Sequence, residues 1–310
     1  MRLVGIHDVR FGATNLDATE RFAADFGLIR VQRTPERLLM RTAGGDSFSY
    51  VAEKADRAHF AGMSFEAESS ADLEEAVARH GATPARALET PGGGRAVTLT
   101  DPNGFKIDIV TGVNRSADAA PLPDLVHNAP HSPLRFGRNQ LGRPLAPPQL
   151  FRLGHVGLFV RNFAESASWY ENTLGLIGSD VYHIPANPKA KIVGFFRLNR
   201  GEKWVDHHTV ALFQRERPDC HHISFEVQDF EAQFVAHRWL KDKGYESIWG
   251  VGRHPHGSHV FDVWRDPDGY RFETFSDTDL LRAADGTRVH DIQTVQMDVW
   301  SSDPPDRYFA

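Results

Sequence analysis

The chain has 310 residues, of which 41% are hydrophobic and 25% charged, and its formal net charge is -6. This composition is that of an ordinary globular protein, and the absence of a run of basic residues argues against nucleic-acid binding. The single cysteine, Cys220, excludes an intrachain disulfide and a cysteine-rich metal site, so histidine and carboxylate side chains must hold any metal.

The N-terminal segment interrupts its apolar residues with His7, Asp8 and Arg10. It therefore lacks the long apolar core of a secretion signal, and no apolar stretch in the sequence reaches the length of a membrane-spanning helix. We expect a cytoplasmic protein that does not act at a membrane.

The first half of the chain predicts strands and helices in a defined order. Residues 5–11 are typical of a strand and residues 15–25 of a helix, and residues 62–67 predict a second strand. A helix over residues 71–79 is expected to end at Gly81. The turn sequence Asp-Pro-Asn-Gly over residues 101–104 then precedes a last strand over residues 105–110.

The second half repeats this order. The corresponding segments are a strand over 154–160, a helix over 162–173, a strand over 222–227, a helix over 230–241 that ends at Gly244, a turn over 266–269 and a strand over 270–275. The repeat predicts an α+β protein of tandem βαβββ modules. We expect a degenerate module pair over residues 1–114, a proline-rich linker over 115–150, a catalytic domain over 151–278 and a tail over 279–310 that wraps back over it.

Three residues of the second copy form a candidate metal site. When the copies are aligned, His155, His222 and Glu273 correspond to His7, Gly62 and Asp108, so the first copy lacks a complete set. A single histidine on a strand is more often a hydrogen-bonded core or surface residue. Two histidines and one glutamate at positions related by the repeat instead favour a site for Fe(II), with coordination positions left open.

The motifs around these residues resemble those of type I extradiol dioxygenases, which belong to the vicinal oxygen chelate superfamily. The matching segments are Gly154-His155-Val156, His221-His222-Ile223-Ser224-Phe225 and Phe272-Glu273. The resemblance implies two domains, each an open β-barrel with outer helices, and often a homo-oligomer. It also implies cleavage of a catecholic ring beside its diol, with insertion of both atoms of O2 and a semialdehyde-type product. Mn(II) prefers the same ligands as Fe(II).

The resemblance also extends to residues around the expected metal. It implies that His208, the second histidine of a strand pair, contacts bound oxygen or substrate, while His207 points to the opposite face and is structural. His254 lies 19 residues before Glu273, the spacing of the family's active-site histidine. An imidazole there could move protons.

The substrate pocket is less well defined by the sequence. His256 and His259 share a Gly- and Pro-containing loop with His254 and are candidate substrate-binding residues. Val263 is a third candidate substrate-binding residue; it stands where the family commonly has a tyrosine, which predicts a reshaped pocket. Six aromatic residues are either pocket or core: Phe195, Phe196, Trp204, Trp249, Phe261 and Trp264.

Two other classes of function remain open. The first is a different metal-dependent enzyme of the superfamily, namely a 2-oxo acid or hydroquinone dioxygenase or a glyoxalase-like lyase. The second is a protein that sequesters a ligand without catalysis. A protein that binds its ligand without metal has no need of His155, His222 and Glu273 together, which argues against the second class. The glyoxalase arrangement commonly shares metal ligands between modules, which argues against a glyoxalase-like lyase.

Overall fold

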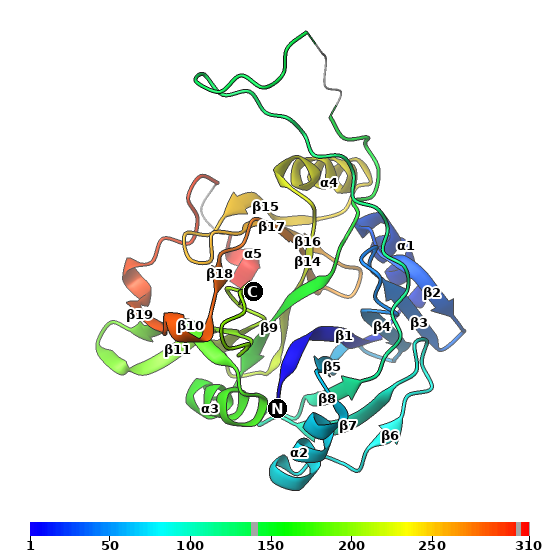
Figure 1. Ribbon diagram of the computed structural model, residues 1–310, viewed down its shortest axis with the longest axis vertical. Helices are drawn as coiled ribbons and strands as arrows, with labels where there is room; N and C mark the ends of the chain where they lie inside the picture. Colours follow the sequence, from blue (N-terminus) through cyan, green and yellow to red (C-terminus); the bar gives the residue numbers. More distant parts are fainter. Residues whose placement is uncertain (138–141, 302–304, 310) are drawn as a thin grey trace.

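The computed structural model describes residues 1–137, 142–301 and 305–309 (Figure 1). Its N-terminal half contains two successive βαβββ units in one eight-stranded sheet with the order β2-β3-β4-β1-β5-β8-β7-β6. The elements are β1 (Leu3–Ala13), α1 (Leu16–Phe26), β2 (Ile29–Arg33), β3 (Arg37–Arg41), β4 (Tyr50–Lys54), β5 (His59–Ala67), α2 (Ser70–His80), β6 (Arg86–Ala87), β7 (Arg95–Thr100) and β8 (Lys106–Thr111).

The C-terminal half repeats the pattern in a nine-stranded sheet with the order β15-β16-β17-β14-β9-β13-β11-β10-β19. The repeat elements are β9 (Leu153–Val160), α3 (Phe163–Leu174), β10 (Ile177–Ile184), β11 (Asn187–Arg197), β13 (Val210–Gln214), β14 (Asp219–Glu226), α4 (Phe230–Asp242), β15 (Ser247–Arg253), β16 (Val260–Arg265) and β17 (Arg271–Ser276). The short strand β12 (Val205–Asp206) has no counterpart in the first half. The predicted α+β fold of tandem modules is confirmed.

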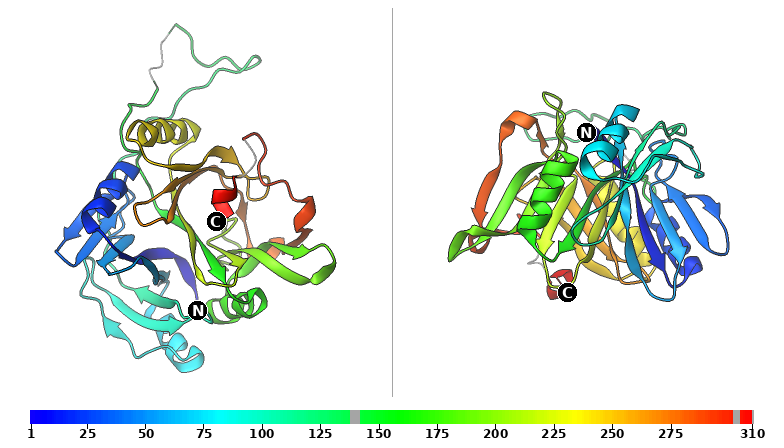
Figure 2. Two further views of the ribbon diagram at one scale, coloured as in Figure 1. Left: turned by 180° about the vertical axis from the view of Figure 1, so that it is seen from behind. Right: turned by 90° about the horizontal axis from the view of Figure 1, so that it is seen from below.

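The tail adds elements that the repeat does not contain. They are β18 (Leu280–Leu281), the 3-10 turn Ala283–Asp285, β19 (Arg288–Asp291), the 3-10 turn Ile292–Thr294 and the short helix α5 (Asp306–Phe309). β18 pairs with β12, and β19 becomes an edge strand beside β10. The tail therefore returns to the C-terminal half, and α5 lies at one end of its strands (Figure 2).

Side chains at the helix ends explain where the helices begin and stop. Asn15 and Asn162 precede α1 and α3, and their side chains accept hydrogen bonds from backbone amides of the first turn. Gly81 ends α2 in the left-handed conformation, as predicted. In α4 the helix ends at Asp242 with Lys243 as its cap, and the next residue, Gly244, has the predicted left-handed conformation with a φ of 81°.

The two halves are joined through matching contacts. The side chain of Asn103, in the turn before β8, accepts a hydrogen bond from the backbone amide of Arg161 at 2.9 Å. The corresponding turn of the other half contains Asp268, which accepts from the backbone amide and hydroxyl of Thr14. Each turn thus fixes the chain just before the first helix of the opposite half.

An aromatic cluster fills the space between the halves. The ring of Phe272, on β17, lies 5.1 Å from that of Phe22, 5.4 Å from that of Phe26 and 5.5 Å from that of Tyr50. These residues belong to one continuous core that includes side chains of both halves. The pairs have tilted or edge-to-face geometry, which is favourable for aromatic rings.

Residues 115–150 have the character of the predicted linker. Within its described residues, the only regular pairing is an isolated bridge between Ala129 and Ser132. The segment extends beyond α4 (Figure 1) and is tied to the start of that helix by an ion pair between Arg143 and Asp229. Among the described residues, no helix is long and apolar enough to cross a membrane.

Candidate metal centre

The three predicted ligands come together on neighbouring strands. In the strand ladder, Ser224 on β14 lies opposite His155 on β9 and opposite Glu273 on β17. His222 lies two residues before Ser224, so both side chains point to the same face of the strand. One donor atom from each of His155, His222 and Glu273 lies within 4.8 Å of the others, and all three residues are buried.

The polar atoms at this site fit a divalent cation. Nε2 of His155 lies 3.1 Å from Oε1 of Glu273 yet makes no hydrogen bond, so it is a buried nitrogen without a partner. Such an atom is costly unless something binds it. The Ser224 hydroxyl donates to Oε1 of Glu273 at 2.6 Å and orients that carboxylate. Two imidazoles and one carboxylate form a set that binds Fe(II), Mn(II) and related ions.

The neighbouring His221 determines which nitrogen of His222 is available. Burial holds the pKa of His221 well below its usual value, so its imidazole is neutral. Its Nε2 lies 3.1 Å from the carbonyl oxygen of Tyr308 and must donate to it, which makes Nδ1 an acceptor. Nδ1 of His222 lies 2.6 Å from that acceptor and therefore carries the hydrogen. Nε2 of His222 keeps the free lone pair that a metal ligand needs.

His207 and His208 form a similar pair. Nε2 of His207 donates to Oδ2 of the buried Asp180 at 2.5 Å, and Nδ1 of His207 lies 3.1 Å from Nδ1 of His208. Burial and the neighbouring His155 hold the pKa of His208 well below its usual value, so its imidazole is neutral and one of its nitrogens can accept a hydrogen bond. Burial tends to raise the pKa of Asp180, but hydrogen bonds from His207 and His290 lower it to about 2. The pair does not continue a strand, because it lies in a bend between β12 and β13.

We expect His221→Leu to weaken divalent metal binding by roughly 10- to 100-fold, the usual cost of losing a partner that orients a ligand. His221→Asn should retain most of the affinity, because its side-chain oxygen can take the place of Nδ1 and accept from His222. Competition with a chromophoric chelator would measure both affinities. Equal affinities for the two variants would contradict the role of His221 as an orienting acceptor.

A cavity of about 120 Å³ opens beside the three ligands. His208, His254, His256 and His259 all line it, whereas Val263 does not and packs instead against Trp249 and Phe261. Of the six aromatic residues left open by the sequence, only Phe195 reaches the cavity. The tail supplies residues that the sequence did not indicate: Ile292, Val295, Gln296, Met297 and Tyr308.

Two of these histidines lie close to the ligands. Nδ1 of His254 lies 2.8 Å from the carbonyl oxygen of Met297 and donates to it, and the imidazole stacks on the ring of Phe261. Nε2 of His259 is 4.0 Å from Oε1 of Glu273. His259 also forms a second group of possible donors with His155 and His208. The site is therefore much richer in imidazole than one set of ligands requires.

The first copy differs from the prediction at one position. Asp8, not His7, lies opposite Ser64, which in turn lies opposite Asp108, so Asp8 is the counterpart of His155. The prediction of His7 was wrong because α3 has 12 residues and α1 has 11, so counting back across the helix shifted the alignment by one. His7 is the residue skipped in the strand pairing, as Gly154 is in the second copy.

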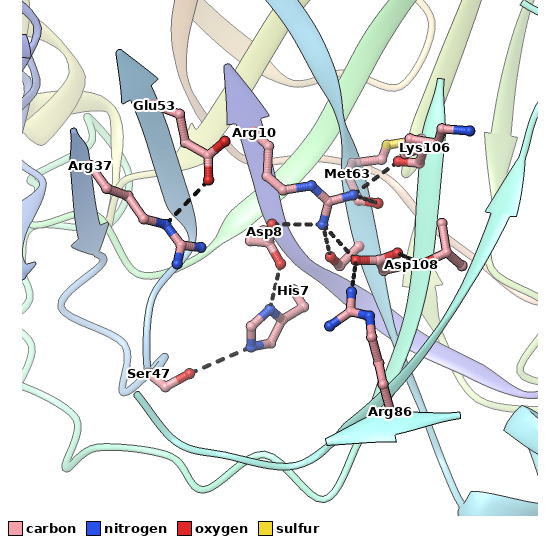
Figure 3. A network of polar contacts seen from close by, with 12 residues as sticks. His7, Asp8, Arg10, Arg37, Ser47, Glu53, Met63, Arg86, Lys106 and Asp108 are labelled. Carbon is pink, nitrogen blue, oxygen red and sulfur yellow. Dashed lines mark hydrogen bonds and ion pairs between the residues drawn. The ribbon is translucent and has the colours of Figure 1, made fainter. Parts of the chain in front are cut away.

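An arginine occupies the position in the first copy that corresponds to the metal site (Figure 3). One Nη atom of Arg10 lies 2.6 Å from the Ser64 hydroxyl, 3.1 Å from Oδ2 of Asp108 and 3.4 Å from Oδ2 of Asp8. The other donates to the backbone carbonyls of Met63 and Lys106. A guanidinium cation thus lies between two carboxylates at the position that corresponds to the candidate metal site.

The strand register explains why the two copies place different side chains in this space. Arg10 lies opposite Gly62 in the first copy, and Gly157 lies opposite His222 in the second. A Cβ at Gly157 would overlap the His222 ring. Each copy therefore has one side chain in this space, facing a glycine that leaves room for it. The large residue is on the first strand in one copy and on the second strand in the other.

Comparison with known proteins agrees with the fold. Residues 152–274 match the model of the Glyoxalase/Bleomycin resistance protein/Dioxygenase superfamily. This segment, which contains all three candidate ligands, belongs to that superfamily. No curated protein matches the sequence.

Solved structures share the fold over nearly the whole chain at low sequence identity. A Mn(II)-bound glyoxalase from Novosphingobium aromaticivorans has a TM-score of 0.79 and 22% identity, covering 99% of this chain and 94% of that one. Homoprotocatechuate 2,3-dioxygenase from Brevibacterium fuscum, bound to 3,4-dihydroxyphenylacetate, has 0.79 and 17%, covering 100% and 92%. The 2,3-dioxygenase LapB from Pseudomonas sp. KL28 has 0.74 and 18%, covering 94% and 99%.

Proposed function

We propose that the protein is an Fe(II)-dependent extradiol dioxygenase that cleaves a catecholic ring. The observation that carries the proposal is the buried set of His155, His222 and Glu273 beside a cavity into which further imidazoles project. All three ligands come from one half of the chain, and the other half has a guanidinium at its equivalent site. Two of the similar structures are 2,3-dioxygenases, one of them in complex with a catechol.

Iron at this site supplies coordination positions for a diol and dioxygen and a route for electrons between them. The surrounding residues supply proton handling. His208 is neutral because burial lowers its pKa, so one of its ring nitrogens can take a hydroxyl proton from the diol and afterwards return it to an oxygen atom. Because Nδ1 of His254 donates to the Met297 carbonyl, Nε2 of His254 is the acceptor in the neutral ring.

A second candidate is Lewis-acid chemistry with Mn(II). It is favoured by the Mn(II)-bound glyoxalase that shares the fold. The four histidines that line the cavity beside the ligand set favour the dioxygenase, because ring cleavage needs groups that accept and return protons at two oxygens.

Oxygen uptake tests the proposal directly. The protein would be loaded with Fe(II) without oxygen and then given catechol, 4-methylcatechol, hydroquinone or a 2-oxo acid in air-saturated buffer. We expect one O2 consumed per catechol ring and a new yellow product in the visible spectrum. Iron-loaded protein that consumes no oxygen with either catechol would contradict the proposal. Conversion of one of these compounds by Mn(II)-loaded protein without oxygen uptake would favour the second candidate.

A matched variant separates catalysis from metal binding in the same assay. His254→Asn keeps the three ligands and a side chain able to hydrogen-bond, so the iron content should stay at one per chain. The turnover number should fall by roughly 100-fold, the usual contribution of a positioned acid or base. Unchanged turnover would remove His254 from the proposed proton path.

A further inference from the structure

We propose that the substrate is a single-ring diol with a small, uncharged substituent. This inference rests on the proposed function and narrows its substrate class. It comes from three features of the cavity: its size, the lack of lysine and arginine among the described residues that line it, and the apolar side chains that the tail adds to its lining.

The volume of the cavity limits the number of rings. It is about 120 Å³, and a cavity of roughly 150 Å³ in another protein accommodates one benzene molecule. A catechol ring therefore fills most of the space. Tyr182 and Phe195 stand on one wall of the cavity, and their rings are 5.8 Å apart in edge-to-face contact. A second fused or linked ring would have to displace such side chains or the tail.

The charge of the cavity limits the substituent. Seventeen described residues line it, and none is lysine or arginine. Glu273 contributes a negative charge, and a deprotonated diol brings more, so the metal ion is already balanced. A carboxylate on the substrate would lose its water without gaining a cation, which is strongly unfavourable. The Brevibacterium enzyme, in contrast, was solved with 3,4-dihydroxyphenylacetate, which carries a carboxylate.

The exposed Arg288 does not change this conclusion. Arg288, on β19, is close enough to His256 to contribute to lowering its pKa, although burial is the main cause. Its side chain is exposed and does not line the cavity. A surface guanidinium remains solvated, so its attraction for a buried carboxylate is weak.

The tail lines another part of the cavity with mostly apolar side chains. Ile292, Val295 and Met297 project into the cavity from the segment after β19. Val193, on β11, contributes another apolar side chain from the sheet. These groups favour a methyl or short alkyl substituent, because each buried CH2 is stabilised by transfer out of water.

Binding without turnover tests the inference. Fe(II)-loaded protein would be titrated calorimetrically in the absence of oxygen with 4-methylcatechol, 3,4-dihydroxyphenylacetate and 2,3-dihydroxybiphenyl. We expect 4-methylcatechol to bind ~100-fold more tightly than the acid. The biphenyl should bind at least ~10-fold more weakly than 4-methylcatechol, because the cavity holds one ring. Equal or tighter binding of the acid or the biphenyl would overturn the inference.

A new positive charge should reverse the preference. Val193→Arg places a guanidinium on the cavity wall, so 3,4-dihydroxyphenylacetate should gain at least ~10-fold in affinity while 4-methylcatechol loses affinity. Ile292→Arg, at a partly exposed edge of the cavity, is a second test that is less demanding on folding. Val289→Arg, an exposed position on β19 outside the cavity, is the matched control and should change neither affinity.

The results also distinguish this inference from the proposed function. If none of the three diols binds to iron-loaded protein, the dioxygenase proposal fails and the substrate class fails with it. If the acid binds best and is cleaved, the dioxygenase proposal stands and only the neutral substrate class is wrong.

Discussion

Glu273→Gln is expected to remove the metal from the protein at neutral pH. The change keeps the shape of the side chain and a carbonyl oxygen for the Ser224 hydroxyl, but it removes the negative charge that attracts a divalent ion to two neutral imidazoles. Metal affinity should fall by well over ~100-fold, more than the loss of an orienting partner causes. Metal content after dialysis, measured by atomic emission, should drop from one ion per chain to nearly none, and oxygen uptake should vanish with it.

The control for this variant is Glu246→Gln. Glu246 is exposed and pairs with Arg265 away from the cavity, so its change should leave metal content and activity as they were. Thermal unfolding of the metal-free proteins should be similar for both variants and the parent, which would show that any loss of metal is local. Full metal content in Glu273→Gln would remove Glu273 from the ligand set.

Arg10→Ala should produce the largest loss of stability outside the metal centre. Asp8 and Asp108 are both buried, and Arg10 lies between them while donating to two carbonyls. Removing one partner of a buried charge pair costs about 3–5 kcal/mol. Arg86 still pairs with Asp108, and Arg10 is partly exposed, so we expect a loss of about 2–3 kcal/mol in the free energy of unfolding.

Denaturant unfolding would measure this loss, and Arg37→Ala provides the comparison. Arg37 also lies in the first sheet, but its partner Glu53 is largely exposed, so its loss should cost less than about 1 kcal/mol. Metal content should remain at one ion per chain in both variants, because all three ligands are in the other half. Equal stability losses for the two variants would show that Arg10 is not an internal counter-ion.

The repeat in the sequence was sufficient to predict the fold and to select the residues that gather at the centre. His155, His222 and Glu273 are 67 and 51 residues apart along the chain, and only the alignment of the copies relates them. The same method placed His7 wrongly, because it counted across helices of different length. The asparagine caps give the correct alignment, since Asn15 follows Asp8 by seven residues and Asn162 follows His155 by seven.

Other parts of the site could not be predicted from the sequence. Tyr308 and Met297 lie in a tail without hydrophobic periodicity, so their contacts depend on how that segment crosses the sheet. His207 and His208 were expected on a strand, but they lie in a bend, where alternation no longer assigns opposite faces. The space left by Gly157 for His222 is likewise a property of packing between strands, which composition does not reveal.

Through the aromatic cluster, the N-terminal half supports the strand that carries Glu273. Glu273 points into the cavity, so its strand neighbour Phe272 points the other way, against Phe22, Phe26 and Tyr50. These three aromatic side chains, which pack behind β17, therefore come from the other copy of the repeat. We therefore expect that the C-terminal half, cut from the chain at the linker, would lose the packing behind the strand of Glu273, because the ring of Phe272 would be exposed to water.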